Sequence, residues 1–153
     1  MRGTQAGTRP GMLNTTVEYD VPVRVAFTYL ADPRNRPEWQ PSLRSVDLLD
    51  EGEPRVGMRW RDLTSAWIAP EMTITGMEKN VLWAESGRWR AIEADLTLGF
   101  APREGGCTVD VAFGVRGRGV LRPVGWVATG VGLFAVRSDL RKAGRILAAR
   151  GVH

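Results

Sequence analysis

Residues 121–150 predict one long amphipathic helix, and this segment constrains the fold more than any other. Small and apolar side chains recur there at steps of three and four, which places them on one helix face. They are Trp126, Thr129, Leu133, Val136, Leu140, Ala143 and Leu147. Arg137, Arg141 and Arg145 step by four along another face, where long cationic side chains contact water. The apolar face therefore needs a large apolar partner.

The N-terminal part of the chain predicts a leader, a strand and two short helices. Residues 1–11 offer little to bury, so we expect a disordered leader, with either Met1 or Met12 as the native start. Residues 13–19 have strand composition. Pro22 opens a helix with apolar residues at i, i+3, i+4 and i+7, and the Asp32-Pro33 step ends it. Between the prolines that follow, at most one short helical turn fits, packed through Trp39.

Short β segments then follow, separated by glycine-containing turns at positions 52, 57, 76, 87 and 105–106. They cover residues 43–49, 58–63, 71–78, 81–86, 88–100 and 107–116. The two longest alternate apolar and polar residues, which gives the sheet one dry and one wet face. We therefore predict an α+β fold: a curved antiparallel sheet of about seven strands wrapped around the C-terminal helix. Residues 12–153 would form a single domain.

Composition and the longest apolar run indicate where in the cell the protein is expected. The chain has one cysteine and a net charge of +4 made of scattered residues, and we find no secretory signal pattern. A reducing cytoplasm is the expected location. The longest apolar run, residues 124–136, is too short and too rich in glycine to span a bilayer, so no integral membrane association is expected.

Few residues suit acid–base, nucleophilic or metal chemistry. The only histidine is the last residue, His153, and Cys107 lies in a glycine-rich turn without an activating neighbour. No cysteine and histidine spacing suggests zinc, and no glycine-rich loop suggests a nucleotide. We therefore expect no metal and no cofactor.

Among the carboxylates, Asp62 is the strongest candidate because alternation places it on the same side as Trp60. Buried there, it needs an arginine or backbone partner, or its pKa rises. Glu71, Glu85 and the phenol of Tyr29 are weaker candidates of the same sort, and a salt bridge at a strand end is the preferred interpretation for each. Glu93 and Asp95 belong to the wet face.

The arginines at 137, 141 and 145 could contact RNA or an anionic membrane. RNA-binding surfaces interleave exposed aromatic residues with basic ones, whereas the tryptophans here are expected inside. We therefore prefer a solvated helix face and expect no nucleic-acid partner. A homodimer is left open.

A cavity between sheet and helix is the central functional expectation. Gly125, Gly130 and Gly132 each cost about 1 kcal/mol in a helix interior, and we interpret them as leaving room for a guest. A tightly packed core is the alternative that residue types alone leave open. The predicted lining is Tyr29, Trp39, Trp60, Asp62, Met72, Ile74, Trp83, Leu96, Val111, Phe113, Trp126, Thr129 and Leu133.

The order of elements and three motifs resemble the START-like (SRPBCC) superfamily, in its polyketide cyclase/dehydrase-like branch. The motifs are the string from Val21 to Pro41, containing D-P-R-N-R-P-E-W-Q-P, the V-G-M-R-W of residues 56–60, and the G-G-C-T-V of residues 105–109. The last departs from the family's G-G-T by the inserted Cys107. The resemblance implies a helix-grip fold with an apolar cavity, which favours a pocket over a solid core.

Three functions follow in order of preference. The first is binding of a small hydrophobic or aromatic molecule, lipid or polyketide-like. The second is a polyketide cyclase or dehydratase that acts by confinement, with Asp62, Tyr29 or a bound water moving protons. The third is an interaction protein that uses its basic helix face in a salt-sensitive manner. Whether the chain is an enzyme stays open at this point.

Overall fold

The computed structural model describes residues 11–151 of the chain. A strand is followed by two short helices, six further strands and a long C-terminal helix, as the sequence predicts. The strands are β1 (Leu13–Tyr19), β2 (Leu43–Leu48), β3 (Arg59–Thr64), β4 (Glu71–Glu78), β5 (Leu82–Trp89), β6 (Ile92–Arg103) and β7 (Gly106–Gly117). The helices are α1 (Val23–Leu30), α2 (Arg36–Trp39) and α3 (Arg122–Ala149), with 3-10 turns η1 (Pro33–Asn35) and η2 (Gly119–Leu121). Residues 1–10 of the predicted leader and His153 lie outside the described residues.

All seven strands form one antiparallel sheet in the order β1-β7-β6-β5-β4-β3-β2. The alternation predicted for the two longest strands is confirmed, because their inward residues are buried: Leu96, Leu98, Phe100, Val109 and Val111. On the other face, Glu93 and Asp95 both pair with Arg116. The predicted dry and wet faces are therefore correct.

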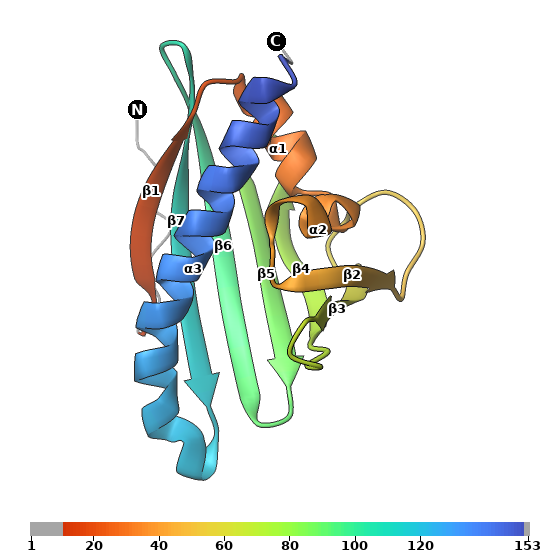
Figure 1. Cartoon of the computed structure of the whole chain (residues 1–153), viewed down its shortest axis with the longest axis vertical. Coiled ribbons are helices and arrows are strands. Elements are labelled where there is room, and N and C mark those ends of the chain that lie inside the picture. Colours follow the sequence, from red (N-terminus) through yellow and green to blue (C-terminus); the bar gives the residue numbers. More distant parts are fainter. Residues whose placement is uncertain (1–10, 152–153) are drawn as a thin grey trace.

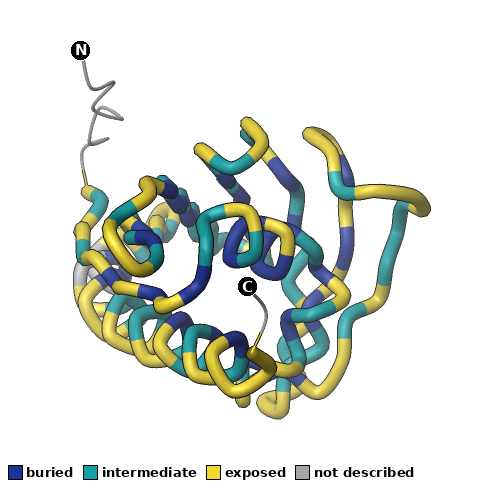
Figure 2. Tube along the Cα trace, turned by 90° about the horizontal axis from the view of Figure 1, so that it is seen from above, coloured by how far each residue is buried: buried dark blue, intermediate teal, exposed yellow. Residues whose placement is uncertain are grey.

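Helix α3 lies over β7 and β1, at one side of the sheet, while α1 and α2 lie beside it (Figure 1). The Tyr19 hydroxyl donates a hydrogen bond to the Leu140 carbonyl at 2.6 Å, and Gly144 lets the tyrosine ring approach the helix. Burial there raises the pKa of Tyr19. Buried residues gather in the space between the helices and the sheet, which forms the core (Figure 2).

Two of the glycines expected in turns lie inside strands. Gly76 is in β4, opposite Ala84 of β5, where the register shifts. Gly87 was expected to separate two strands, but it lies inside β5, and the turn comes later, where Arg90 has a positive φ of 54°. A Cβ on Gly87 would lie 2.6 Å from the sulfur of Met72 in β4. The glycine is therefore required by close packing and does not mark a turn.

The edge of β7 next to β1 is completed by a side chain. Pairing between the two strands runs from Tyr19↔Cys107 to Leu13↔Phe113, so the end of β7 extends beyond β1. There the Thr129 hydroxyl of α3 accepts a hydrogen bond from the Val115 N–H at 2.9 Å and donates to the Gly125 carbonyl at 2.7 Å. The start of α3 is thereby fixed against the end of β7.

Candidate functional site

A buried ionic cluster joins α2 to the inner face of the sheet. The Arg36 guanidinium donates to Asp62 Oδ2 of β3 at 2.9 Å and to Glu85 Oε2 of β5 at 2.8 Å. All three residues are 4% exposed. Burying charged groups costs desolvation free energy unless every charge is paired. This cluster therefore distinguishes the core from a purely apolar one.

Each carboxylate of this cluster is also held by a tryptophan two residues earlier on the same strand. Trp60 Nε1 donates to Asp62 Oδ1 at 2.9 Å, and Trp83 Nε1 donates to Glu85 Oε2 at 3.3 Å. Residues two apart in a strand point to the same face, which is why the two W-x-acid motifs converge. The arginine, which the sequence reasoning missed, comes from the proline-rich segment before Trp39.

The cluster keeps unused hydrogen-bonding capacity. Arg36 Nε and Trp39 Nε1 are buried and have no hydrogen-bond partner among the described residues. The guanidinium carbon lies 5.8 Å from the Trp39 ring centre and 5.4 Å from that of Trp60. Two aromatic faces therefore supplement the two carboxylates around this cation.

Burial governs the protonation of the cluster. It raises the pKa of Glu85, with the Arg36 cation opposing the shift. Burial alone would lower the pKa of Arg36, but the facing carboxylates outweigh it and the pKa is raised. With all three groups ionised, the cluster would carry one excess negative charge. The raised pKa of Glu85 is consistent with relief of that excess.

Asp139 of α3 is a further carboxyl group that sequence reasoning missed. It is half-buried, and burial raises its pKa to about 6, although Lys142 and Arg36 oppose the shift. Among the described residues it has no hydrogen-bond or ion-pair partner. A partly desolvated carboxyl that titrates near neutral pH is suited to exchange protons with a bound molecule.

The predicted lining residues divide into packed and accessible groups. Trp39, Trp60, Ile74, Trp83 and Val111 are at most 1% exposed, so no water-sized space adjoins them. Met72 and Leu96 retain 8% and 6% exposure. Phe113 and Leu133, together with Val136, pack against the core yet stay partly exposed. The side chain of Trp126 lies outside the described part of the structure.

The strand register connects the accessible apolar residues to the ionic cluster. Phe113, Leu96, Glu85 and Ile74 are successive cross-strand partners on β7, β6, β5 and β4. The next row on the same face runs Val115, Ala94, Gly87 and Met72. Its two central residues have the smallest side chains, and Ala94 is partly exposed. Met72 packs over Gly87, so the partly exposed positions of this row are Val115 and Ala94.

The interpretation of the helix glycines as space for a guest needs correction. A Cβ on Gly125 would lie 2.8 Å from the Val115 carbonyl oxygen, and one on Gly132 would lie 2.4 Å from Cε1 of Phe113. Gly130 has nothing within 4 Å, and it is exposed. Two of the glycines thus permit close packing of α3 on β7, and the third faces away from the core.

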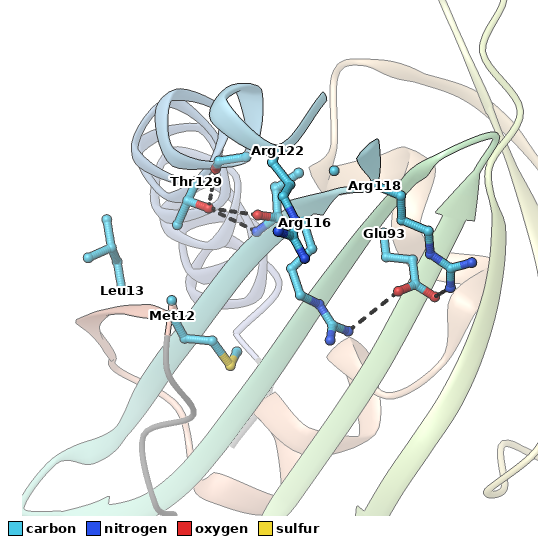
Figure 3. Close-up of a pocket in the computed structure, with 11 residues that line it drawn as sticks. Met12, Leu13, Glu93, Arg116, Arg118, Arg122 and Thr129 are labelled. Atoms are coloured by element: carbon cyan, nitrogen blue, oxygen red, sulfur yellow. Dashed lines mark hydrogen bonds and ion pairs between the residues drawn. The ribbon is translucent and has the colours of Figure 1, made fainter. Parts of the chain in front are cut away.

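Two open hollows flank the core. One of about 760 Å³ lies under the start of α3 and is lined by Met12, Glu93, Arg116, Arg118 and Thr129, among others (Figure 3). In it Arg116 and Arg118 both point toward the Glu93 carboxylate. The other, of about 670 Å³, lies near the end of α3 and is lined by Tyr29, Leu147 and Arg150 with parts of α1. Two predicted residues, Thr129 and Tyr29, thus line hollows at opposite ends of α3.

The remaining candidates have structural partners. The Tyr29 hydroxyl donates to Glu38 Oε2 at 3.1 Å, and burial together with this carboxylate raises its pKa to about 12. Both carboxylate oxygens of Asp62 accept hydrogen bonds, one from Arg36 and one from Trp60, so the salt bridge preferred from the sequence is present. Glu71 is half-buried at the start of β4. Within residues 11–151, no group of acidic, histidine and cysteine residues could hold a metal ion.

Solved structures share this architecture over nearly the whole chain. A START superfamily protein from Mycobacterium smegmatis superposes with a TM-score of 0.72 at 13% identity, covering 90% of this chain and 99% of that one. Ara h 8.0201 gives a TM-score of 0.73 at 11% identity, covering 90% and 97%. The di-domain aromatase/cyclase StfQ of the steffimycin biosynthetic pathway gives 0.72 at 14% identity, covering 92% of this chain and 52% of that one. No match was found among curated proteins.

The protein thus has the helix-grip fold of this class of START-like structures. Within that class, residues 12–151 match the model of the family described as polyketide cyclase / dehydrase and lipid transport. The chain belongs to this family, which confirms the resemblance drawn from its motifs.

Proposed function

We propose that the protein binds a small hydrophobic or aromatic ligand, lipid or polyketide-like, between the inner face of the sheet and α3. The observation that carries this proposal is the row from Phe113 through Leu96 to Glu85, where a partly exposed aromatic side chain and a buried leucine lead to a buried charged group. An apolar molecule with one polar group fits such a surface. Membership of a family described by polyketide and lipid activities supports it.

In this arrangement, the apolar part of the ligand would lie on Ala94, Phe113, Leu133 and Val136. Its polar group would face Asp139 and the arginine-centred cluster. Asp139 is half-buried and Ala94 is partly exposed, so both can contact a bound molecule. No metal or cofactor is required for binding of this kind.

The test is a titration that follows intrinsic tryptophan fluorescence with fatty acids and polycyclic aromatic compounds. Ala94→Leu should lower affinity about tenfold or more, because the larger side chain would occupy the space beside this partly exposed position. Ala112→Leu, on the opposite face of the same sheet, is the matched control and should bind normally. Mass spectrometry of extracts from protein purified from its native host would identify a retained ligand. Absence of both quenching and retained ligand would reject the proposal.

The second candidate is a cyclase or dehydratase that confines a reactive chain. It is favoured by the two carboxyl groups with raised pKa, Asp139 and Glu85, near the accessible apolar surface. Asp62 and Tyr29 are less suitable proton carriers, since the first is fully paired and the second has its pKa raised to about 12. On a genuine substrate, Asp139→Asn should abolish a pH-dependent step that Tyr29→Phe preserves. Equal turnover in wild type and Asp139→Asn would eliminate this role for Asp139.

A further inference from the structure

The side of α3 that faces away from the sheet carries an exposed apolar stripe. Val127 is 70% exposed, Val131 68% and Phe134 78%. Their i, i+4, i+7 spacing places them on a single face, opposite the buried Thr129 and Leu140. Before the helix, Val120 of η2 is 93% exposed as well. Isolated exposed apolar residues are ordinary, but an aligned series on one helix indicates a contact surface.

Two arginines continue the same face toward the C-terminus. Arg141 and Arg145 follow Phe134 at helical spacing, and both are exposed. Neither has an ion-pair partner among the described residues. The expectation of a purely solvated basic face took no account of the apolar residues ahead of these arginines. We call Val127, Val131, Phe134, Arg141 and Arg145 the outer face of α3.

Charge distribution identifies the kind of partner. The only acidic residue of α3 is Asp139. It is half-buried and interacts electrostatically with Arg36, which lies on the core side of the helix. The outer face is therefore apolar and cationic with no carboxylate of its own. Two copies of the chain joined through this face would place Arg141 and Arg145 against either the same arginines or the apolar stripe, with no counter-charge in either case, which disfavours self-association.

We propose that the outer face of α3 binds the surface of an anionic lipid bilayer. The helix would lie in the plane of the interface, with the apolar stripe among the acyl chains and the two arginines at lipid phosphates. The face from Val127 to Arg145 is roughly 27 Å long at the usual helical rise, which suits such a flat contact. Among the described residues no helix is long and apolar enough to cross a bilayer. Binding would therefore be peripheral and reversible.

The experiment is flotation of the full chain with vesicles of phosphatidylcholine alone or mixed with phosphatidylserine. Binding should require phosphatidylserine and weaken with salt. Arg141→Gln/Arg145→Gln should lower affinity about 25-fold, given about 1 kcal/mol for each arginine near an anionic surface. The matched control Arg44→Gln/Arg61→Gln removes the same charge from exposed positions on β2 and β3, and should retain most of the binding.

The apolar stripe is tested separately. Val131→Ser/Phe134→Ser should lower affinity about tenfold or more. Val56→Ser/Trp67→Ser changes residues of similar type that are 58% and 84% exposed elsewhere, and should leave affinity unchanged. Circular dichroism confirms that each variant folds. Three results would overturn the proposal: equal flotation with both vesicle types, equal losses in the variants and their controls, or a dimer in light scattering that Val131→Ser/Phe134→Ser dissociates.

Discussion

Gly125 of α3 lies so close to Val115 of β7 that a Cβ on the glycine would be 2.8 Å from the valine carbonyl oxygen. A backbone atom cannot move aside as a flexible side chain can. Five residues later Gly130 faces open space. The two glycines of one helix therefore make a matched pair in which helix propensity and packing can be separated.

We expect Gly130→Ala to raise the free energy of unfolding by about 1 kcal/mol, through helix propensity alone. Gly125→Ala should lower it, because the same gain is outweighed by displacement of α3 from β7. Urea denaturation of both variants measures the difference. Equal stabilisation by the two substitutions would show that the contact between α3 and β7 is looser than described.

Thr129→Val should lower the free energy of unfolding by about 1 to 3 kcal/mol. The substitution keeps the shape of the side chain but leaves the Val115 N–H without its acceptor at a partly buried position. Thr16→Val removes an exposed threonine hydrogen bond to Asp110 and serves as the control, with a much smaller expected effect. Hydrogen exchange at the Val115 amide should accelerate in Thr129→Val alone. An unchanged exchange rate would contradict the assignment.

Arg36→Met should be among the most destabilising substitutions, at about 3 to 5 kcal/mol, because it leaves two buried carboxylates without their cation. Neutralising the carboxylates as well, in Arg36→Met/Asp62→Asn/Glu85→Gln, should recover part of this loss while keeping acceptors for the two tryptophans. Thermal and urea unfolding of both variants provide the comparison. Losses that simply add across the three substitutions would show that the groups are energetically independent.

Asp139→Asn should change how stability depends on pH. Because burial raises the pKa of the folded carboxyl to about 6, the folded state holds this proton more tightly than the unfolded state. Its contribution is therefore favourable at low pH and is lost as pH rises from about 4 to about 6. Asp139→Asn should be more stable than wild type at about pH 8 and nearly equal to it at about pH 4.

The control for that experiment is Asp47→Asn on the exposed side of β2. Urea denaturation across the pH range should show a pH-dependent difference from wild type for Asp139→Asn only. A flat difference between Asp139→Asn and wild type would mean that Asp139 is fully hydrated in the folded protein.

Sequence periodicity was sufficient to predict the fold, because buried residues recur at regular spacing within each helix and strand. The residues chosen for the inner face of α3 include Leu140, Ala143 and Leu147, which are all buried, and Leu96 and Leu98 of β6 are buried in alternation. The error at Gly87 arose because a glycine inside a strand resembles a turn when its neighbour on the next strand is unknown. Trp67, at 84% exposed, likewise departs from the expectation that the tryptophans lie inside.

The site was harder to predict from the sequence than the fold, because it depends on the register in which the strands pair. Asp62 was selected as a carboxylate needing an arginine partner, but only the sheet brings it together with Glu85, and only α2 supplies Arg36. A usable signal was present in the paired motifs Trp60-Arg61-Asp62 and Trp83-Ala84-Glu85. Asp139 could also have been noticed, since it follows Val136 by three residues on the inward side of the helix. The lining of the ligand surface stays a prediction.

The position of Cys107 has a practical consequence for labelling. It is the only cysteine of the chain, it is 0% exposed, and burial raises the pKa of its thiol. Thiolate reagents should therefore react with it very slowly in the folded protein. A cysteine introduced at Val131 would be the single fast-reacting site, so a fluorophore or spin label could be attached there without first removing the native thiol.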